Sequence, residues 1–376
     1  MNVSRDIGVY IHIPFCKQRC HFCAFYLEVA KPERMSAFSK ALEREIDVYH
    51  RHGMIGNRLL RSLYFGGGTP TVLPVSQLVS LLRSAQAAWP TDLSVEITVE
   101  AHPATITATD LSILANAGFN RISFGAESMN QNDFSPIGRP GRVRDTEIAV
   151  NAARTAGFIN INLDLMYGLP GQSLASLQTT LQSLLTLDPT HVSCYALTVE
   201  EGTRFAQDIA RNLIPPPDEA LHIEMESAAE TILQAAGLVR YEISNYAKPG
   251  FASRHNLLYW TDGDYLGLGP SAQSYVNGVR FGNVADVTAY VDLLSEDRLP
   301  LAERTDLSVE EQHRDALVFG LRLIEGVPRL LVRPDMPQHH TLALLGDRGL
   351  IEWNKERIRL TTLGRRYADS VAQELY

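Results

Sequence analysis

The sequence predicts an α/β fold, a partial (β/α)6 barrel of the TIM type followed by a small winged-helix-like C-terminal domain. Between residues 7 and 197, short apolar segments alternate with longer segments of helical periodicity, a pattern typical of repeated βα units and a parallel sheet. After residue 306, two helical patterns precede a hairpin pattern. Six βα units make an open barrel, and the active site of such a barrel is expected at the carboxyl ends of its strands.

Each strand of the predicted barrel is short and apolar, and a helical pattern follows each of the first five. We expect the strands at residues 7–13, 62–65, 94–100, 121–125, 160–165 and 191–197. We expect the helices between them at residues 32–52, 75–88, 109–117, 143–156 and 173–187. Gly118 and Gly157 stand just after two of these helices, where a left-handed C-terminal cap favours glycine.

Beyond residue 200 the alternation weakens, and the chain divides into three predicted parts. Three prolines at 215–217 mark a turn before a helix at 218–236. Residues 239–300 are predicted to be loop-rich with an added edge element. The last part is predicted to hold helices at 308–325 and 338–348, a hairpin at 350–360 and a final helix at 362–375. The predicted domains are a barrel at 1–200, an accessory region at 201–300 and a C-terminal domain at 301–376.

Length, composition and charge exclude several classes of protein. A chain of 376 residues with 45% hydrophobic content can bury a large core. No segment approaches the ~18 apolar residues of a membrane span and no signal peptide opens the chain, so we expect a cytoplasmic protein whose membrane contact is at most peripheral. The net charge of −9 argues against nucleic acid as a partner. Residues 306–376 hold 10 basic and 11 acidic residues, so the winged-helix pattern implies no DNA-binding face.

The most specific motif joins three of the four cysteines, Cys16, Cys20 and Cys23, directly after the first predicted strand. Three thiolates can hold three irons of a [4Fe-4S] cube, which leaves the fourth iron open to a small molecule. The alternative is a zinc site completed by His12 or His21, although this spacing without a second Cys/His pair is unusual for structural zinc. An odd number of clustered thiols does not favour a disulfide. Cys194 stands alone in an apolar segment and is interpreted as a buried structural thiol.

Polar and glycine motifs stand where the predicted strands end. The second strand runs into the glycines at 66–68 and Thr69. Such a run lets the backbone approach a ligand closely, although a simple turn would also explain it. Carboxylates and one arginine follow at the ends of the next strands: Glu100, Glu127, Arg139 and Asp164. Each could be a structural hydrogen-bonding group, but together they suit the ammonium, hydroxyl and carboxylate groups of one ligand.

With these motifs the chain resembles the radical SAM superfamily, whose Cys-x3-Cys-x2-Cys loop holds a [4Fe-4S] cluster with S-adenosylmethionine (SAM) on the open iron. Within that superfamily it is similar to the HemN-like branch, and most of all to the HemW-like heme chaperones. The similarity covers nearly the whole chain and includes the segments 10–16, 66–71, 164–170, 197–203 and 241–247. It implies a radical SAM barrel, in which a reduced cluster can cleave SAM to a 5′-deoxyadenosyl radical.

The resemblance also assigns roles to residues of this chain. The cluster ligands would be Cys16, Cys20 and Cys23. The SAM contacts would be Tyr10, Phe22, Gly67, Gly68, Thr69, Glu100, Arg139 and Asp164. Glu127 belongs to the same set, at a position where the family normally has glutamine.

Two features separate the branches of this family. Coproporphyrinogen oxidases carry a further cysteine two residues after the third, and here that residue is Phe25, so this oxidase activity is not expected. HemW-like proteins have a His-Asn-x-x-Tyr-Trp motif, which is complete here with His255, Tyr259 and Trp260. An imidazole beside aromatic rings suits heme, and a hydrogen-bonded structural histidine is the alternative. Gln273, a further candidate for heme or substrate, stands where HemW-like proteins usually have histidine.

The resemblance therefore predicts a protein that binds one [4Fe-4S] cluster, SAM and heme, and passes heme as cargo to heme-accepting proteins such as those of respiration. Its oligomeric state, monomer or dimer, stays open. A catalytic HemN-like enzyme is the alternative: a methyltransferase, cyclopropanating or other biosynthetic enzyme that uses SAM as radical source and alkyl donor on a small molecule would share the same cluster and SAM residues. A third, non-enzymatic alternative is a zinc-stabilised binding protein.

Overall fold

A twelve-stranded mixed sheet forms the main body of the protein, and the computed structural model describes residues 6–333 and 336–376. The six predicted barrel strands lie side by side in its middle, parallel and in chain order. They are β1 (Ile7–Ile13), β4 (Leu60–Gly67), β5 (Thr91–Ala101), β6 (Arg121–Glu127), β7 (Asn160–Tyr167) and β8 (His191–Ala196). The predicted α/β fold with an incomplete barrel is confirmed, because the sheet has two edges and does not close.

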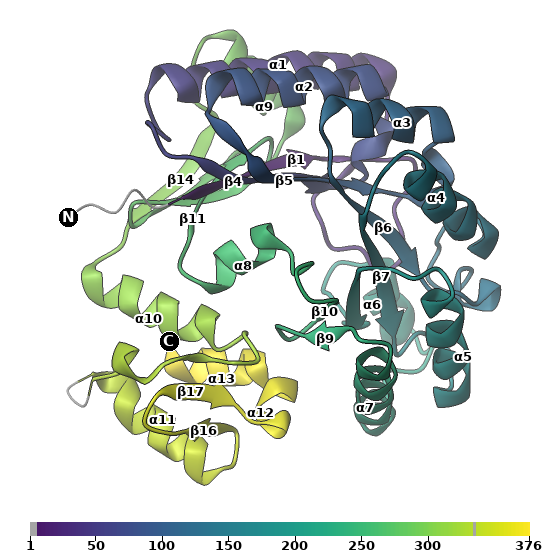
Figure 1. Ribbon diagram of the computed structural model, residues 1–376, viewed down its shortest axis with the longest axis vertical. Coiled ribbons are helices and arrows are strands. Elements are labelled where there is room, and N and C mark those ends of the chain that lie inside the picture. Colours follow the sequence, from purple (N-terminus) through teal and green to yellow (C-terminus); the bar gives the residue numbers. More distant parts are fainter. Residues whose placement is uncertain (1–5, 334–335) are drawn as a thin grey trace.

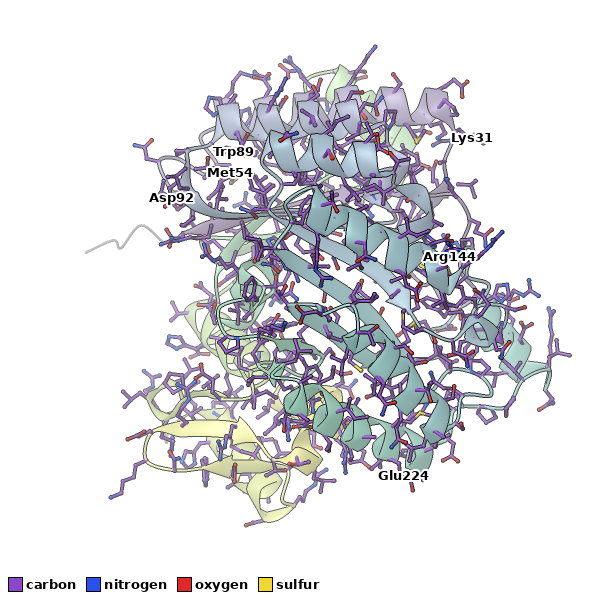
Figure 2. The ribbon with its side chains drawn as sticks, turned by 45° about the vertical axis from the view of Figure 1, so that its right-hand side comes forward. Lys31, Met54, Trp89, Asp92, Arg144 and Glu224 are labelled. Atoms are coloured by element: carbon purple, nitrogen blue, oxygen red, sulfur yellow. The ribbon has the colours of Figure 1, made fainter. Side chains whose placement is uncertain are left out.

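The helices that connect these strands cover the outer face of the sheet (Figure 1). They are α1 (Pro32–Arg51), α2 (Val75–Ala88), α3 (Ala108–Ala117), α4 (Val143–Thr155) and α5 (Leu174–Leu185), and α6 (Arg204–Ala210) and α7 (Glu219–Ala235) follow β8. Short 3-10 turns lie at Pro70–Val72, Pro103–Thr105, Gln131–Asp133 and Arg329–Leu331. Charged side chains of the outer helices, such as Arg144 and Glu224, are exposed, as Figure 2 shows.

The central strands alternate between an apolar and a polar face. In β6, Ile122 and Phe124 are fully buried in the main hydrophobic cluster, together with residues of the outer helices. Ser123, Gly125 and Glu127 of the same strand line a cavity on the inner face. Because side chains of a strand point alternately to its two faces, this pattern builds the core outside the barrel and leaves a polar interior for a ligand.

The segment from 239 to 306 extends the sheet at both edges, where the sequence had predicted one added edge element. At one edge β10 (Asn245–Ala247) pairs with β8 and with β9 (Val239–Arg240). At the other edge, the added strands are β11 (Asp264–Leu268), β12 (Gln273–Val276), β13 (Val279–Asn283) and β14 (Leu301–Asp306). β11 runs parallel to β1, from Ile7 opposite Asp264 to Ile11 opposite Leu268. The prediction named too few strands because strands this short show little periodicity in the sequence.

Two helices of the same segment lie on opposite sides of the sheet. α8 (Arg254–Trp260) lies on the inner side, and α9 (Val287–Ser295) packs beside α1 on the outer side (Figure 1). The backbone N–H groups of Arg254 and His255 donate to the buried carboxylate of Glu96 in β5, at 3.1 and 3.2 Å. α8 is thereby fixed to the inner face of the sheet at the amino-terminal half of the strands.

A buried carboxylate of α1 holds the added strands in place. Glu45 is fully buried and accepts hydrogen bonds from the backbone N–H of Gly269 (2.7 Å), the side-chain amide of Asn283 (2.6 Å) and the hydroxyl of Tyr290 (2.6 Å). These partners lie after β11, in β13 and in α9. Burial raises the pKa of Glu45 to about 7, against the three hydrogen bonds, which lower it.

The C-terminal part has its own hydrophobic cluster, which includes Leu317, Leu342 and Ile358. It contains α10 (Val309–Gly320), β15 (Val327–Pro328), α11 (Pro337–Asp347), β16 (Ile351–Trp353), β17 (Arg357–Leu360), α12 (Thr362–Arg366) and α13 (Ala368–Leu375), with strand order β15-β17-β16. Helices followed by a small sheet agree with the predicted winged-helix-like domain. The prediction of one final helix over 362–375 is wrong, because Tyr367 leaves the helical conformation and its hydroxyl binds Glu219 of α7 at 3.0 Å.

No helix among residues 6–333 and 336–376 combines the length and the hydrophobicity that crossing a bilayer requires.

Candidate functional site

Cys16 ends the short strand β2 (Phe15–Cys16), and Cys20 and Cys23 lie on the loop from there to β3 (Glu28–Val29), with which β2 pairs. Arg19 holds this loop together, since its guanidinium donates to three carbonyls of the loop, those of Cys23 (3.2 Å), Phe25 (3.2 Å) and Leu27 (3.0 Å). The loop is also tied to the segment after β6, because Gln18 donates to the carbonyl of Gly138 (2.9 Å) and the N–H of His21 to that of Ile137 (2.9 Å). The loop is therefore held by the side chains of Arg19 and Gln18 and by a backbone hydrogen bond to the segment after β6.

Cys16, Cys20 and Cys23 are half-buried and line one cavity of about 610 Å³ at the carboxyl ends of the strands. Burial raises the pKa of all three thiols, that of Cys20 to about 11. Within the described parts of the chain, no three His, Cys, Asp or Glu side chains are placed to hold a single metal ion. A [4Fe-4S] cube takes each thiolate on a different iron, and the three cysteines that line this cavity supply three such thiolates.

The glycine turn after β4 forms the wall beside Cys16. The hydroxyl of Thr69 lies 3.3 Å from the sulfur of Cys16. At Gly68 the chain passes so close to β2 that a Cβ atom would stand 2.6 Å from the carbonyl oxygen of Phe15, which only glycine tolerates. Gly67 has a φ of +110°, and its N–H donates to Glu100 at 3.1 Å. The turn thus exposes backbone atoms of Gly67 and Gly68 to the cavity, with no side chain in front of them.

Glu100 connects this turn with the interior of the barrel. Its second oxygen accepts a hydrogen bond from the hydroxyl of Tyr64 at 2.7 Å. Burial raises the pKa of Glu100 to about 7, and the charge of Asp164 adds to that effect. Asp164 itself accepts from the side-chain amide of Asn162 at 2.7 Å, and burial raises its pKa as well. Both carboxylates line the cavity, where a cationic or hydroxyl-bearing ligand would compensate their burial.

Glu127 and Arg139 form a buried ion pair on the same cavity. The guanidinium lies 3.3 Å from one carboxylate oxygen of Glu127, and the side chains of Glu127 and Arg139 are 9% and 7% exposed. The hydroxyl of Tyr195 donates to the other oxygen at 3.1 Å. Glu127 adopts a φ of +62°, which is unusual for a residue other than glycine. Burial raises the pKa of Glu127, and the positive charge of Arg139 lowers it. The guanidinium of Arg139 is therefore partly neutralised by a carboxylate of the protein itself.

The structure brings eleven of the twelve predicted cluster and SAM residues to this one cavity. Tyr10 does not line it: its ring packs beside those of Tyr64 and His255, with centroid distances of 5.9 and 6.1 Å. Sequence reasoning missed the inner polar lining, which includes Ser123, Ser193, Tyr195, Ser244 and Asn245. The alternation of polar residues along β6, β7 and β8 was the available signal for the first three.

The predicted heme residues lie elsewhere, and the structure does not bring all four together. His255 on α8 is 1% exposed, and both ring nitrogens are hydrogen-bonded, to the hydroxyls of Ser62 and Tyr259 at 2.8 Å each. Burial lowers its pKa to about 3, and the positive charge of Arg121 contributes. A heme iron could bind this ring only after one of the two hydrogen bonds had broken.

Trp260 and Gln273 face other parts of the molecule. The indole of Trp260 packs under the guanidinium of Arg322, 4.8 Å from the ring centroid, and so contacts the C-terminal part. Gln273 is exposed in β12 and donates to Glu303 of β14 at 3.1 Å. The residues of the His-Asn-x-x-Tyr-Trp motif therefore join the barrel interior to the C-terminal part.

Known proteins are similar to this chain in sequence and in fold. Residues 10–184 match the family model of the radical SAM superfamily. Proteins named heme chaperone HemW are 35% identical in Bacillus subtilis (97% of each chain covered), 32% identical in Mycobacterium tuberculosis (99% of this chain, 95% of the relative) and 37% identical in Escherichia coli (86% and 84%). Among solved structures, coproporphyrinogen III oxidase (HemN) from Escherichia coli, described as a radical SAM enzyme, aligns with a TM-score of 0.84 at 25% identity, over 99% of this chain and 90% of that chain.

Proposed function

The chain belongs to the HemW family of radical SAM proteins, and from this we propose that it binds a [4Fe-4S] cluster, SAM and heme, and delivers heme to heme-accepting proteins. The observation that carries the proposal is the cavity at the carboxyl ends of the strands. There, three half-buried thiols line one cavity together with a glycine turn, three carboxylates and an arginine. This set of donors fits an iron–sulfur cube with one open corner and a small zwitterionic ligand beside it.

Each group of this cavity has a proposed part in binding. Cys16, Cys20 and Cys23 hold three irons. The backbone of the glycine turn and Glu100 accept from the ammonium group of SAM, Asp164 accepts from its ribose hydroxyls, and Arg139 binds its carboxylate. When bound and reduced, the cluster supplies the electron that cleaves SAM. The buried, polar walls keep SAM oriented and exclude bulk water from it.

The ion pair of Glu127 and Arg139 leads to a prediction about SAM affinity. In Glu127→Gln the guanidinium loses its anionic partner, so it binds the SAM carboxylate with its full charge. We expect SAM to bind about three- to tenfold more tightly, which corresponds to about 0.7–1.4 kcal/mol. The measurement is a SAM titration of the reduced, reconstituted protein, followed by the change in the electron paramagnetic resonance signal of the cluster. Tyr195→Phe is the control that keeps the ion pair, and weaker binding by Glu127→Gln would contradict the assignment of Arg139.

The heme chaperone proposal is tested with anaerobically reconstituted full-length protein. We expect saturable binding of one hemin per chain, seen as a shifted Soret band, and subsequent transfer of the heme to an added apo-hemoprotein. The transfer is measured as the gain of the acceptor's own Soret spectrum after the two proteins are separated. The absence of saturable hemin binding would refute the proposal.

A catalytic radical SAM enzyme that acts on a small molecule is a second candidate. The observation that favours it is the inner polar lining of the cavity, with Ser123, Ser193 and Asn245, beyond the residues proposed to contact SAM. Phe25, which is 68% exposed at the same cavity, replaces the extra cysteine of the coproporphyrinogen oxidases. Formation of 5′-deoxyadenosine together with a modified small molecule would favour this candidate over the chaperone. Zinc in place of iron and sulfide would refute both.

A further inference from the structure

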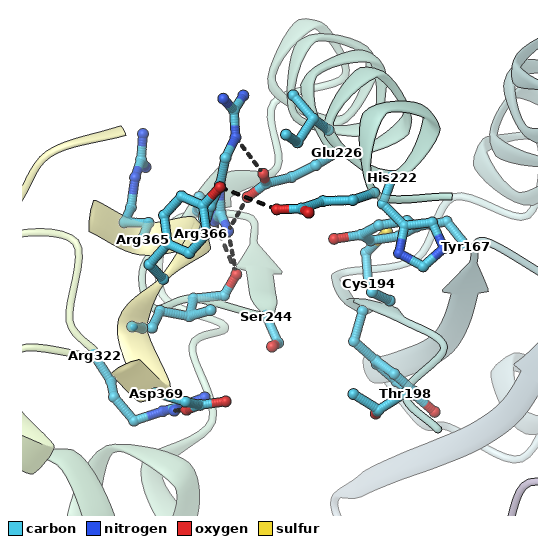
Figure 3. A pocket seen from close by; sticks show the side chains of 18 residues that line it. Tyr167, Cys194, Thr198, His222, Glu226, Ser244, Arg322, Arg365, Arg366 and Asp369 are labelled. Carbon is cyan, nitrogen blue, oxygen red and sulfur yellow. Dashed lines mark hydrogen bonds and ion pairs between the residues drawn. The ribbon is translucent and has the colours of Figure 1, made fainter. Parts of the chain in front are cut away.

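A second cavity, of about 360 Å³, lies between the main body and the C-terminal part. One wall comes from β7, β8 and α7, and the other from α12 and the start of α13 (Figure 3). Its volume falls within the range of small-molecule pockets, roughly 300–1,000 Å³. Tyr195 and Ser244 line this cavity and also the cavity of the cysteines, so the two cavities adjoin.

His222 of α7 presents an available imidazole to this cavity. The ring is half-exposed and packs edge-on against Tyr167, with the centroids 6.0 Å apart. Across residues 6–333 and 336–376, no hydrogen bond engages either ring nitrogen of His222. The buried histidines differ: both nitrogens of His255 are engaged, and so are those of His191, by Asn162 and Tyr241. Of these three, only His222 can bind a metal without breaking a hydrogen bond.

The lining of the cavity is rich in arginine, and Arg365 and Arg366 of α12 lie on the wall opposite α7. Four guanidinium groups line the cavity, those of Arg240, Arg322, Arg365 and Arg366, against three carboxylates, those of Glu219, Glu226 and Asp369. Arg240 is held by Glu226 and Glu230 at 3.0 and 2.8 Å. Arg365 has the loosest pair, 3.5 Å from Glu230. Because arginine recognises carboxylates through paired hydrogen bonds, this lining can accept a ligand that carries carboxylate groups.

We propose that this second cavity is the heme site of the protein, with His222 as an axial ligand of the iron and Arg365 as the partner of a propionate. The inference rests on the proposed function as a heme chaperone and names the place where the cargo binds. The apolar side chains of Ile223 and Ile243 and the rings of Tyr167 and Tyr367 line the same space and supply flat and apolar contacts for a porphyrin. Imidazole is a common axial ligand of heme iron.

The position of the cavity also suits release of the cargo. His222 and Tyr167 belong to the main body, whereas Arg365 and Tyr367 belong to the part of the chain with its own hydrophobic cluster. The two walls are joined across the cavity by polar contacts, such as Arg366 with Glu226 at 3.0 Å and Tyr367 with Glu219 at 3.0 Å. A shift of the C-terminal part would therefore expose a bound heme without unfolding either core.

The test compares hemin titrations of the anaerobically reconstituted full chain and its variants. We expect His222→Ala to weaken hemin binding at least about tenfold and to shift the Soret band, because the iron loses an axial nitrogen. His52→Ala, an exposed histidine at the end of α1, is the matched control and should titrate as the unaltered chain does. If His222→Ala gives the spectrum and affinity of the unaltered chain, the inference is overturned while the chaperone proposal stands. If the unaltered chain binds no heme, both fail.

A second measurement tests whether Arg365 binds a heme propionate. The unaltered chain should bind hemin at least about tenfold more tightly than hemin dimethyl ester, whose propionates are neutral. Arg365→Gln should remove most of this preference. Arg348→Gln, in which an exposed arginine paired with Glu374 is lost, should retain it. An undiminished preference in Arg365→Gln would overturn the assignment of this arginine.

Discussion

The variant Cys20→Ala is expected to lose the iron–sulfur cluster completely while the protein remains folded. The cysteine loop is held by hydrogen bonds of Arg19 and of its backbone, and none of its three cysteines belongs to a hydrophobic cluster. With two thiolates left, a cube has two irons without a protein ligand. The measurements are iron and sulfide content after anaerobic reconstitution, absorption near ~400 nm and circular dichroism.

The remaining cysteine provides the control for this experiment. Cys194 is 5% exposed and lies in the main hydrophobic cluster, and burial raises its pKa to about 12, so its thiol is not a ready ligand. Cys194→Ala should therefore bind a full complement of iron and sulfide. A collapse of the helical circular dichroism signal in Cys20→Ala would show instead that the cysteines are chiefly structural.

The variant Glu45→Ala is expected to destabilise the protein by about 3 kcal/mol or more, because three buried donors lose their acceptor and each costs about 1–3 kcal/mol. The donors are Gly269, Asn283 and Tyr290, so the loss falls on the added strands and α9. The measurement is the denaturant midpoint of the variant and the unaltered chain in the same cluster state. Glu33→Ala, an exposed glutamate in the first turn of the same helix, should change the midpoint by a few tenths of a kcal/mol at most.

The cost of Glu45→Ala should also depend on pH. Folding raises the pKa of Glu45 from 4.5 to about 7, so the folded state binds a proton more tightly than the unfolded state does. This contribution to stability is full below about pH 4.5 and is lost as the pH rises to about 7. The variant lacks it, and we expect the difference in unfolding free energy between the two proteins to be larger at pH 5.5 than at pH 8. A difference that grows with pH would contradict the burial of this carboxyl group.

The strands of the barrel could be predicted because each is a short apolar segment, whereas the strands added after β8 could not. β1 and β11 pair across the length of the chain, and no local pattern encodes such a partner. One signal was nevertheless available: Asn277 and Gly278, both at positive φ, join β12 and β13, and Asn-Gly is the preferred turn of a two-residue hairpin.

The cavity of the cysteines could be predicted because the carboxyl ends of parallel strands meet at one edge of the sheet. Ser244 and Asn245 of its inner lining could not be predicted, since they come from a segment that the sequence predicts to be loop-rich. No sequence pattern marks His222 as a candidate ligand. It stands in an amphipathic helix among glutamates, and only the docking of α12 against α7 turns that surface into a cavity.

The pairing of β1 has a consequence for biosynthesis. The strand that leads into the cysteine loop lies between β4 and β11, and the last residue of β11, Leu268, follows Ile13 by 255 positions. At about 5–20 residues per second, a ribosome needs roughly 13–50 s to make that stretch. Throughout this time the nascent chain has an uncovered strand edge next to three reduced thiols. This edge of β1 can be covered only after translation has passed residue 268.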